Sequence, residues 1–267
     1  MRTNKKWTRI YVDGIDISGY VRDAGTLSEQ SDAIDDACLT DAVKNSIIGQ
    51  GTISAGPLNA VLDNDTTTYP AGLFKSFGTA GALHYTTVVM GTPNGPNLSD
   101  PFFSWYLAET SFQKVEGSGG FVSVSLTLDK GAGGYSAYDN PWGVTLHARA
   151  NETAVNAANT PLVCDWGLVP PATGGLFVYH LFTATAAGAG TVVLKMQDSL
   201  DGSTSWGDVA LATSGALTTN VTTTPVGGIV PIGTSTAVKR YTRWQLVFGG
   251  GTPPTGADFF AGFIRNT

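Results

Sequence analysis

The chain has 267 residues, of which 42% are hydrophobic and 13% are charged, and its formal net charge is −6 at pH 7. That length suffices for one large or two ordinary domains, while the charged fraction is well below the ~25% that is typical of soluble domains. Because phosphate binding needs clustered Lys and Arg, the composition argues against a nucleic-acid-binding protein.

The sequence predicts neither a secretion signal nor a membrane span. Met1–Lys6 is polar and basic, and no apolar run approaches the ~20 residues that a membrane helix needs. Cys38 and Cys164 lie far apart in the sequence, and we interpret both as buried small hydrophobic residues rather than as a disulfide. We therefore expect a protein that is made in a cytoplasm and has no membrane partner.

Alternation of apolar and polar residues predicts several strands in the first half. The clearest case is 121–130, where strict alternation indicates one buried and one exposed face. Residues 7–12 also alternate, and Asp13-Gly14 then gives a strong hairpin-turn signal with a return strand at Ile15 and Ile17. Further strands are expected at 52–62, 84–90 and 103–114. In 121–130 the apolar face comprises Val122, Val124, Leu126 and Leu128, and the polar face comprises Ser123, Ser125, Thr127 and Asp129.

Helical signals are few. Pro70 precedes Ala71–Phe77, and proline suits the first turn of a helix, so one short helix is expected there. Residues 32–46 are ambiguous, because a helical stripe of apolar residues is interrupted by acidic ones. We expect only a short helical turn near Thr40–Asn45 in that segment.

After His147 the composition changes. Residues 148–160 are rich in Ala and Asn and show no alternation, which is typical of a linker. Strand patterns return beyond Pro161 and are separated by turn signals at Asp201-Gly202, Gly227-Gly228 and Pro253-Pro254. The residues expected to face a core are Val192, Leu194, Met196, Trp244, Leu246, Phe248, Phe259, Ala261 and Phe263.

Many short strands between Gly, Pro and Asp turns predict a mainly β protein built from two β-sandwich domains. The expected division is a first domain at 1–148, a linker at 149–160 and a C-terminal accessory sandwich at 161–267.

No pattern of residues predicts catalysis. The sequence has no nucleophile elbow, no phosphate-binding glycine loop and no zinc-ligand pair, so we expect no catalytic residue, no metal and no cofactor. The histidines, at positions 84, 147 and 180, lie in or beside expected strands, and we interpret them as structural. Asp63-Asn64-Asp65 and 198–208 lack calcium-loop spacing and are interpreted as polar turns.

One acidic cluster is conspicuous. Five acids fall within thirteen residues, with no Lys or Arg between them. Charge runs usually form a solvated face. The alternative is that they line an acidic channel or form an electrostatic face used in assembly, and the sequence leaves both interpretations open. The five residues are Glu29, Asp32, Asp35, Asp36 and Asp41.

Several segments resemble the tail-tube (major tail) proteins of long-tailed bacteriophages. They are IYVDGIDISGYVRDAG, LTDAVKNSIIGQGTISAGPLNAVLDN and YDNPWGVTLH, together with the ending RYTRWQLVF and FFAGFIRN. The resemblance covers most of the chain and is strongest over residues 7–63.

The resemblance implies a virion protein whose first sandwich closes into rings, expected to be hexameric, that stack around a DNA channel. The partners would be further copies of the chain and other tail proteins, and the DNA would be enclosed without sequence-specific binding. The second sandwich would be an outward domain of immunoglobulin-like or jelly-roll type. Two alternatives are kept: another virion structural or decoration protein, and a carbohydrate-binding module of the kind used in host adhesion.

Overall fold

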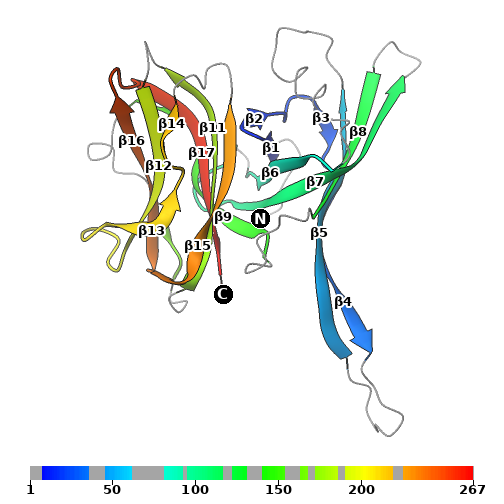
Figure 1. The fold of residues 1–267 in the computed structure, drawn as a ribbon, viewed down its shortest axis with the longest axis horizontal. Helices are drawn as coiled ribbons and strands as arrows, with labels where there is room; N and C mark the ends of the chain where they lie inside the picture. The colour runs from blue at the N-terminus through cyan, green and yellow to red at the C-terminus, as the bar shows by residue number, and fades with distance from the viewer. Residues whose placement is uncertain are drawn as a thin grey trace, which may run out of the picture.

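The computed structural model describes residues 8–35, 46–61, 81–92, 95–116, 122–130, 140–153, 163–167, 172–185, 190–218 and 225–266. No helix occurs in these segments, which are mostly antiparallel strands (Figure 1). The mainly β, sandwich-based fold expected from the sequence is therefore confirmed. The helix expected at 71–77, the turn at 40–45 and Cys38 lie outside the described residues.

Eight strands form the first half of the fold. They are β1 (Thr8–Val12), β2 (Ile15–Asp16), β3 (Val21–Asp23), β4 (Thr26–Asp35), β5 (Ser46–Val61), β6 (Leu83–Met90), β7 (Pro101–Glu116) and β8 (Val122–Lys130).

Nine strands follow. They are β9 (Trp142–Glu152), β10 (Cys164–Asp165), β11 (Ala172–Thr185), β12 (Gly190–Ser199), β13 (Gly207–Thr213), β14 (Leu217–Thr218), β15 (Val226–Val238), β16 (Tyr241–Gly250) and β17 (Gly256–Arg265).

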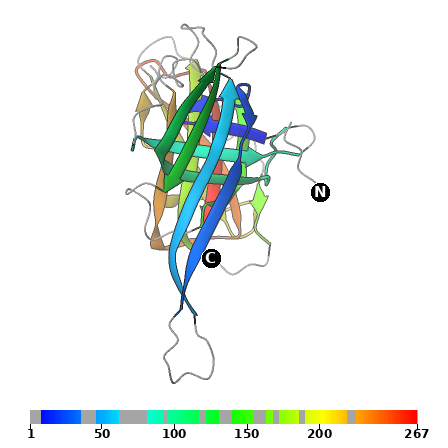
Figure 2. The ribbon, with the colours of Figure 1, turned by 90° about the vertical axis from the view of Figure 1, so that its right-hand side faces the viewer.

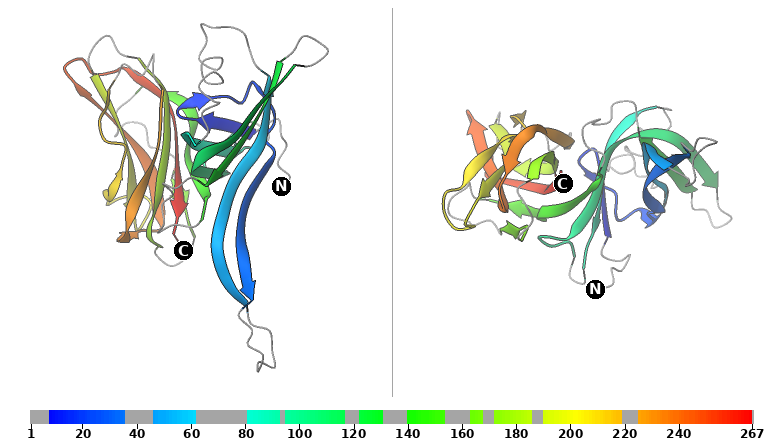
Figure 3. Two further views of the ribbon diagram at one scale, coloured as in Figure 1. Left: turned by 45° about the vertical axis from the view of Figure 1, so that its right-hand side comes forward. Right: turned by 90° about the horizontal axis from the view of Figure 1, so that it is seen from below.

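The strands form one branched sheet and one small sheet. The path β15-β11-β17-β9-β7-β6-β1-β2 is continuous, and β7 also pairs with β8, which leads through β5 to β3 and β4. The small sheet has the order β10-β16-β12-β13, with β14 beside β12. It packs on one side of β15-β11-β17-β9, and the first half lies on the other side (Figures 1 and 3).

The hairpin at the start of the fold is the one that the sequence predicts. Val12 pairs with Ile15, and Asp13 and Gly14 between them have φ angles of 50° and 83°, as a two-residue turn of this type requires. The Asp13 carboxylate also accepts the Tyr85 N–H at 2.8 Å and lies 2.7 Å from His84 Nδ1. The turn is thus anchored to β6.

The register expected for 121–130 is confirmed in β8. Val124, Leu126 and Leu128 are buried, whereas Ser123 is exposed and Ser125 is half-buried. The buried face belongs to a first hydrophobic core shared with Ile53 of β5, Trp105 of β7 and other residues of the first half. Alternation succeeds here because only one face of the strand meets a core.

Strands β11 and β17 are buried on both faces. Phe177 and Tyr179 of β11 belong to a second core that faces the small sheet, whereas Val178 and Phe182 belong to the first core. Phe259 and Phe260 of β17 divide between the cores in the same way. The sheet β15-β11-β17-β9 is therefore a layer common to both halves.

The turn expected at Gly227-Gly228 is wrong. Both glycines lie inside β15 and pair with His180 and Tyr179 of β11. A Cβ at position 228 would lie 2.5 Å from the Tyr179 hydroxyl, and one at 227 would lie 2.8 Å from His180 Nδ1. The glycines thus make room for two large rings, and a pair of glycines alone does not distinguish this use from a turn.

The linker expected at 149–160 begins too early. Residues 149–152 continue β9, where Ala150 and Asn151 pair with Phe259 and Asp258 of β17. The other side of β9 pairs with β7 near Phe103, so β9 carries hydrogen bonds to both halves. Residues 154–162 lie outside the described ones, and the division into two domains stays a prediction.

An exposed arginine joins the halves electrostatically. Arg149 of β9 donates to Asp16 Oδ2 of β2 at 2.7 Å and to Asp258 Oδ2 of β17 at 2.8 and 3.0 Å. Its guanidinium carbon lies over the ring of Phe182, 4.3 Å from the centroid, so the cation also covers an aromatic ring of the first core.

The histidines are part of the packed structure. Gly14 N–H donates to His180 Nδ1 at 3.1 Å, so the neutral ring carries its hydrogen on Nε2 and donates it to Thr87 Oγ1 at 2.8 Å. His147 packs against Phe259, with 4.2 Å between ring centroids. Burial lowers the pKa of both His147 and His180 to about 4.

The two faces of β8 give a first test. Leu126→Ala should lower the free energy of unfolding by about 2–5 kcal/mol, because it removes a buried side chain from a packed core. Ser125→Ala, the matched change on the opposite face, should shift it by less than about 0.5 kcal/mol. Urea denaturation of both variants measures the difference, and a costlier Ser125 change would mean that the register is off by one residue.

The buried histidines predict how stability depends on pH. The unfolded chain binds protons as pH falls below the ordinary histidine value of ~6.5, whereas the native rings take them up only near pH 4. Stability should therefore fall between these values and show no further histidine effect below them. His147→Phe keeps the ring packing and should remove on the order of 2 kcal/mol of that loss.

Urea denaturation between about pH 7 and about pH 4 measures this effect, with Tyr241→Phe as the control because it removes a hydroxyl and leaves all the histidines in place. If His147→Phe has the same pH dependence as the unchanged protein, the assignment of the loss to His147 is wrong.

Candidate assembly interface

Strands β4 and β5 form a long two-stranded arm that projects from the rest of the molecule (Figures 1 and 2). The two strands pair from Thr26 and Gly56 at the base to Asp35 and Ser46 at the far end. Beyond the base, the arm leaves the sheet to which it is attached, because β8 pairs with β5 only from Ser54 onward.

Both outer edges of the arm lack a strand partner among the described residues. Strand β4 pairs only with β5, and 46–53 of β5 pair only with β4. A two-stranded ribbon is at best marginally stable in water, and unpaired edge groups readily bind another strand. The arm is therefore the part of the described fold that most requires a partner.

The base of the arm is held in a fixed direction. Gly25, which connects β3 to β4, has φ +62°, and a Cβ there would lie 2.5 Å from the Pro57 carbonyl oxygen. Ser28 and Ser54 hydroxyls are hydrogen-bonded across the two strands at 2.8 Å. The backbone at Gly25 comes so close to the backbone of β5 that only glycine fits there. This contact fixes the point at which the arm leaves the rest of the fold.

The acidic cluster maps largely onto this arm. Glu29, Asp32 and Asp35 belong to β4, where Glu29 is exposed, and Asp36 and Asp41 lie outside the described residues. Three of the five acidic residues are thus part of the arm, and both interpretations of the cluster stay predictions. The ambiguous residues 32–35 are strand rather than helix, because their hydrogen-bonding partners are in β5.

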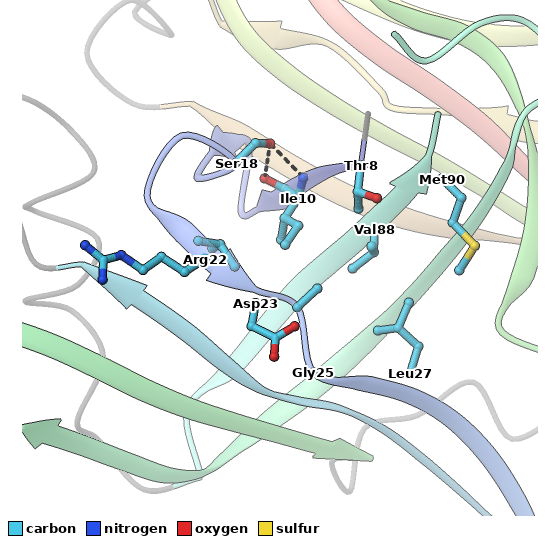
Figure 4. Close-up of a pocket in the computed structure, with 11 residues that line it drawn as sticks. Thr8, Ile10, Ser18, Arg22, Asp23, Gly25, Leu27, Val88 and Met90 are labelled. Atoms are coloured by element: carbon cyan, nitrogen blue, oxygen red, sulfur yellow. Dashed lines mark hydrogen bonds between the residues drawn. The ribbon is translucent and has the colours of Figure 1, made fainter. Parts of the chain in front are cut away.

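An open groove lies at the foot of the arm, where the β3–β4 connection approaches β1 and β6 (Figure 4). Its volume is about 250 Å³. Its polar lining residues are Thr8, Ser18, Arg22 and Asp23. Since the groove adjoins the arm, the two form one candidate interface. The apolar lining comprises Ile10, Val21, Ala24, Leu27, Val88 and Met90.

The groove contains no arrangement typical of catalysis. Among all described side chains, no group of three or more His, Cys, Asp or Glu residues is placed to hold a metal ion. Cys164 is buried, with its sulfur 3.6 Å from the Ser99 hydroxyl, and burial raises the pKa of its thiol.

No helix long and apolar enough to cross a membrane occurs in the described segments.

Comparison with known proteins gives little. No family model matches the chain, and no curated protein sequence is significantly similar to it. Among solved structures, the chain is weakly similar to the crystal structure of SPP1 Dit (gp 19.1), described as a paradigm of the hub adsorption apparatus in phages that infect Gram-positive bacteria. The match covers 97% of this chain and 99% of that one, with 12% identity and a TM-score of 0.32, and a likeness this weak carries no inference.

Proposed function

We propose that this chain is a structural protein of a bacteriophage tail, without enzymatic activity, that assembles with copies of itself through the β4–β5 arm. The observation that carries the proposal is the pair of unpaired strand edges on a ribbon that projects from the body. In a ring of subunits, each arm would pair with the arm of a neighbour, and closure of the ring would remove every free edge. The resemblance of residues 7–63 to tail-tube proteins agrees with this role.

In its specific form, the proposal is that the arms line a channel through which DNA passes. A wall that carries Glu29, Asp32 and Asp35 repels phosphate, so DNA gains no affinity for it and passes without being retained. The low charged fraction of the chain, 13%, suits the remaining surfaces to contact with other protein rather than with solvent.

The arm itself supplies the first test. Gln30 and Thr52 are directly paired, so residues 31–51 can be replaced by an Asn-Gly turn that closes the hairpin at its base. The protein with the shortened arm should stay folded and monomeric. The unchanged protein should form rings or tubes at high concentration. Negative-stain electron microscopy and analytical ultracentrifugation measure this, with long incubation to allow slow assembly.

A matched control shortens another hairpin. Replacement of residues 117–121 by Asn-Gly joins Glu116 to Val122, which are also paired, and should leave assembly intact. Oligomers formed by the arm-shortened protein, or an unchanged protein that stays strictly monomeric, would contradict the proposal.

The channel is tested separately. The triple variant Glu29→Lys, Asp32→Lys and Asp35→Lys should fold and assemble, but should bind DNA inside the tube with an affinity that falls steeply as salt rises. Gel retardation and filter binding across a salt series measure the effect.

Control substitutions on the small sheet make the same change in net charge at a distance from the arm: Asp165→Lys, Asp208→Lys, Leu200→Lys and Ala210→Lys. This control should bind DNA more weakly. Equal DNA binding by both variants, or none by the arm variant, would return the acidic cluster to an ordinary solvated face.

A further inference from the structure

A chain of buried hydrogen bonds crosses the contact between the two halves of the fold. It begins at the turn between β1 and β2, where the Gly14 N–H donates to His180 Nδ1 of β11 at 3.1 Å. The ring lies 2.8 Å from Thr87 Oγ1 of β6 through its Nε2, and Thr87 is hydrogen-bonded to the Ser104 hydroxyl of β7 at 2.7 Å. The Ser104 hydroxyl donates to the Thr86 carbonyl oxygen at 3.1 Å. The chain therefore connects the turn through β11 to β6 and β7.

The direction of each hydrogen bond in this chain is fixed. A backbone N–H can only donate, so Nδ1 of His180 is the accepting nitrogen and the neutral ring carries its hydrogen on Nε2. Ser104 gives its hydrogen to a carbonyl oxygen, so Thr87 donates to Ser104 and accepts from the ring. Because these three side chains are completely buried, solvent does not replace a partner that is lost.

The ring of His180 has little room to turn or to move. Gly227 of β15 lies against it, and a Cβ on that glycine would lie 2.8 Å from His180 Nδ1 and 3.0 Å from the Gly14 nitrogen. A Cβ on Gly14 would lie 2.4 Å from the Val226 nitrogen, so the turn also lies directly on the start of β15. On another side, the Tyr11 ring packs with its centroid 5.6 Å away. The contact between Gly14 and His180 can therefore open only if the turn leaves β15.

The charged groups that act on this ring come from the β1–β2 hairpin and are Asp13 and Asp16. Asp13 accepts the Tyr85 N–H and lies 2.7 Å from His84 Nδ1, and Asp16 pairs with Arg149 at 2.7 Å. Burial outweighs both carboxylates and lowers the pKa of the ring to about 4. The other elements packed against the ring contribute neutral groups, since burial also raises the pKa of the Tyr11 phenol: Thr87 of β6, Gly227 of β15, Phe260 of β17 and Tyr11 of β1.

We propose that His180 is a proton-operated latch, which holds the β1–β2 turn on β11 and β15 while its ring is neutral and releases the turn when the ring is protonated. The added proton has to bind Nδ1, where it faces the Gly14 N–H, so a donor then meets a donor across 3.1 Å. Release lets solvent reach the ring while the two hydrophobic cores stay packed. The latch does not depend on the proposed assembly through the arm.

Amide hydrogen exchange followed by NMR tests the latch in the full-length protein. The closed ring takes up a proton near pH 4, whereas a released ring does so near the ordinary value of ~6.5, so release should become about a hundredfold more favourable from pH 7 to pH 4. The protection factor of the Gly14 amide should fall by the same factor. At pH 7, the ¹⁵N chemical shifts of the His180 ring should show the hydrogen on Nε2.

Low concentrations of urea distinguish release of the turn from unfolding of the whole protein. Release exposes little surface, so exchange of the Gly14 amide at pH 4 should depend only weakly on urea. Exchange of the Leu126 amide, in the central strand β8, should rise steeply with urea because it requires global unfolding.

Gly227→Ala should open the same contact without acid. Its Cβ would press on both His180 Nδ1 and the Gly14 nitrogen, so the Gly14 amide should be weakly protected at pH 7 and should change little down to pH 4. Gly207→Ala, the matched control in β13, has no atom within 4 Å of the added Cβ and should exchange like the unchanged protein. His147→Phe removes the other buried histidine and should keep the full change at Gly14.

Four results would each overturn the proposal. They are Gly14 protection that stays constant from pH 7 to pH 4, an equal change in the Gly227→Ala variant, exchange at Gly14 that rises with urea as steeply as at Leu126, and a His180 ring that carries its hydrogen on Nδ1 at pH 7. The first, third and fourth need only the unchanged protein, so the test does not rely on the folding of a variant.

Discussion

Strands β11 and β17 have to satisfy two hydrophobic cores at once, and the rest of the structure depends on this double burial. Successive residues such as Phe177 and Val178 enter opposite cores, so both faces of these two strands are covered by apolar side chains. Each half of the fold hides apolar surface of the other. Separating them would expose large rings on both sides, at roughly 25 cal/mol for each Å² of apolar surface. Cohesion between the halves thus arises from the hydrophobic effect rather than from a short connecting segment.

The polar groups at this junction have a different role from the apolar ones. Arg149 bridges Asp16 and Asp258 at the surface, where ion pairs contribute little to stability but fix geometry. The bridge holds β2 of the first half close to β17 of the second. The Tyr11 hydroxyl, which has no hydrogen-bond partner among the described residues, interacts electrostatically with the three residues of this bridge. The contact between the two halves thus contains charged and polar groups, whereas the two cores are apolar.

The sequence predicts the strands with one buried face and fails where burial or partners differ. Val124, Leu126 and Leu128 alternate with polar residues, and their register is correct. Gly227 and Gly228 were expected to form a turn, because the rings that they accommodate come from a strand 45 or more residues earlier. Residues 32–35 give no strand pattern in the sequence, although this end of β4 pairs with β5. A polar cavity lined by Arg9, Asp16, Arg149 and Asp258 gives no local signal either, because its walls come from positions 9–16, 95–96, 148–151 and 258.

In the proposed assembly, the marginal stability of a free two-stranded ribbon has a consequence for the kinetics of growth. The first contact between two subunits orders one arm edge against another while most edges stay unpaired, so its entropic cost is offset only in part. Later subunits pair with an edge that is already ordered. They therefore gain more favourable free energy for the same loss of conformational entropy. Polymerisation should therefore show a lag phase and a critical concentration below which the monomer persists. A pre-formed template would remove the lag, so the place where growth begins would be set by the template rather than by chance.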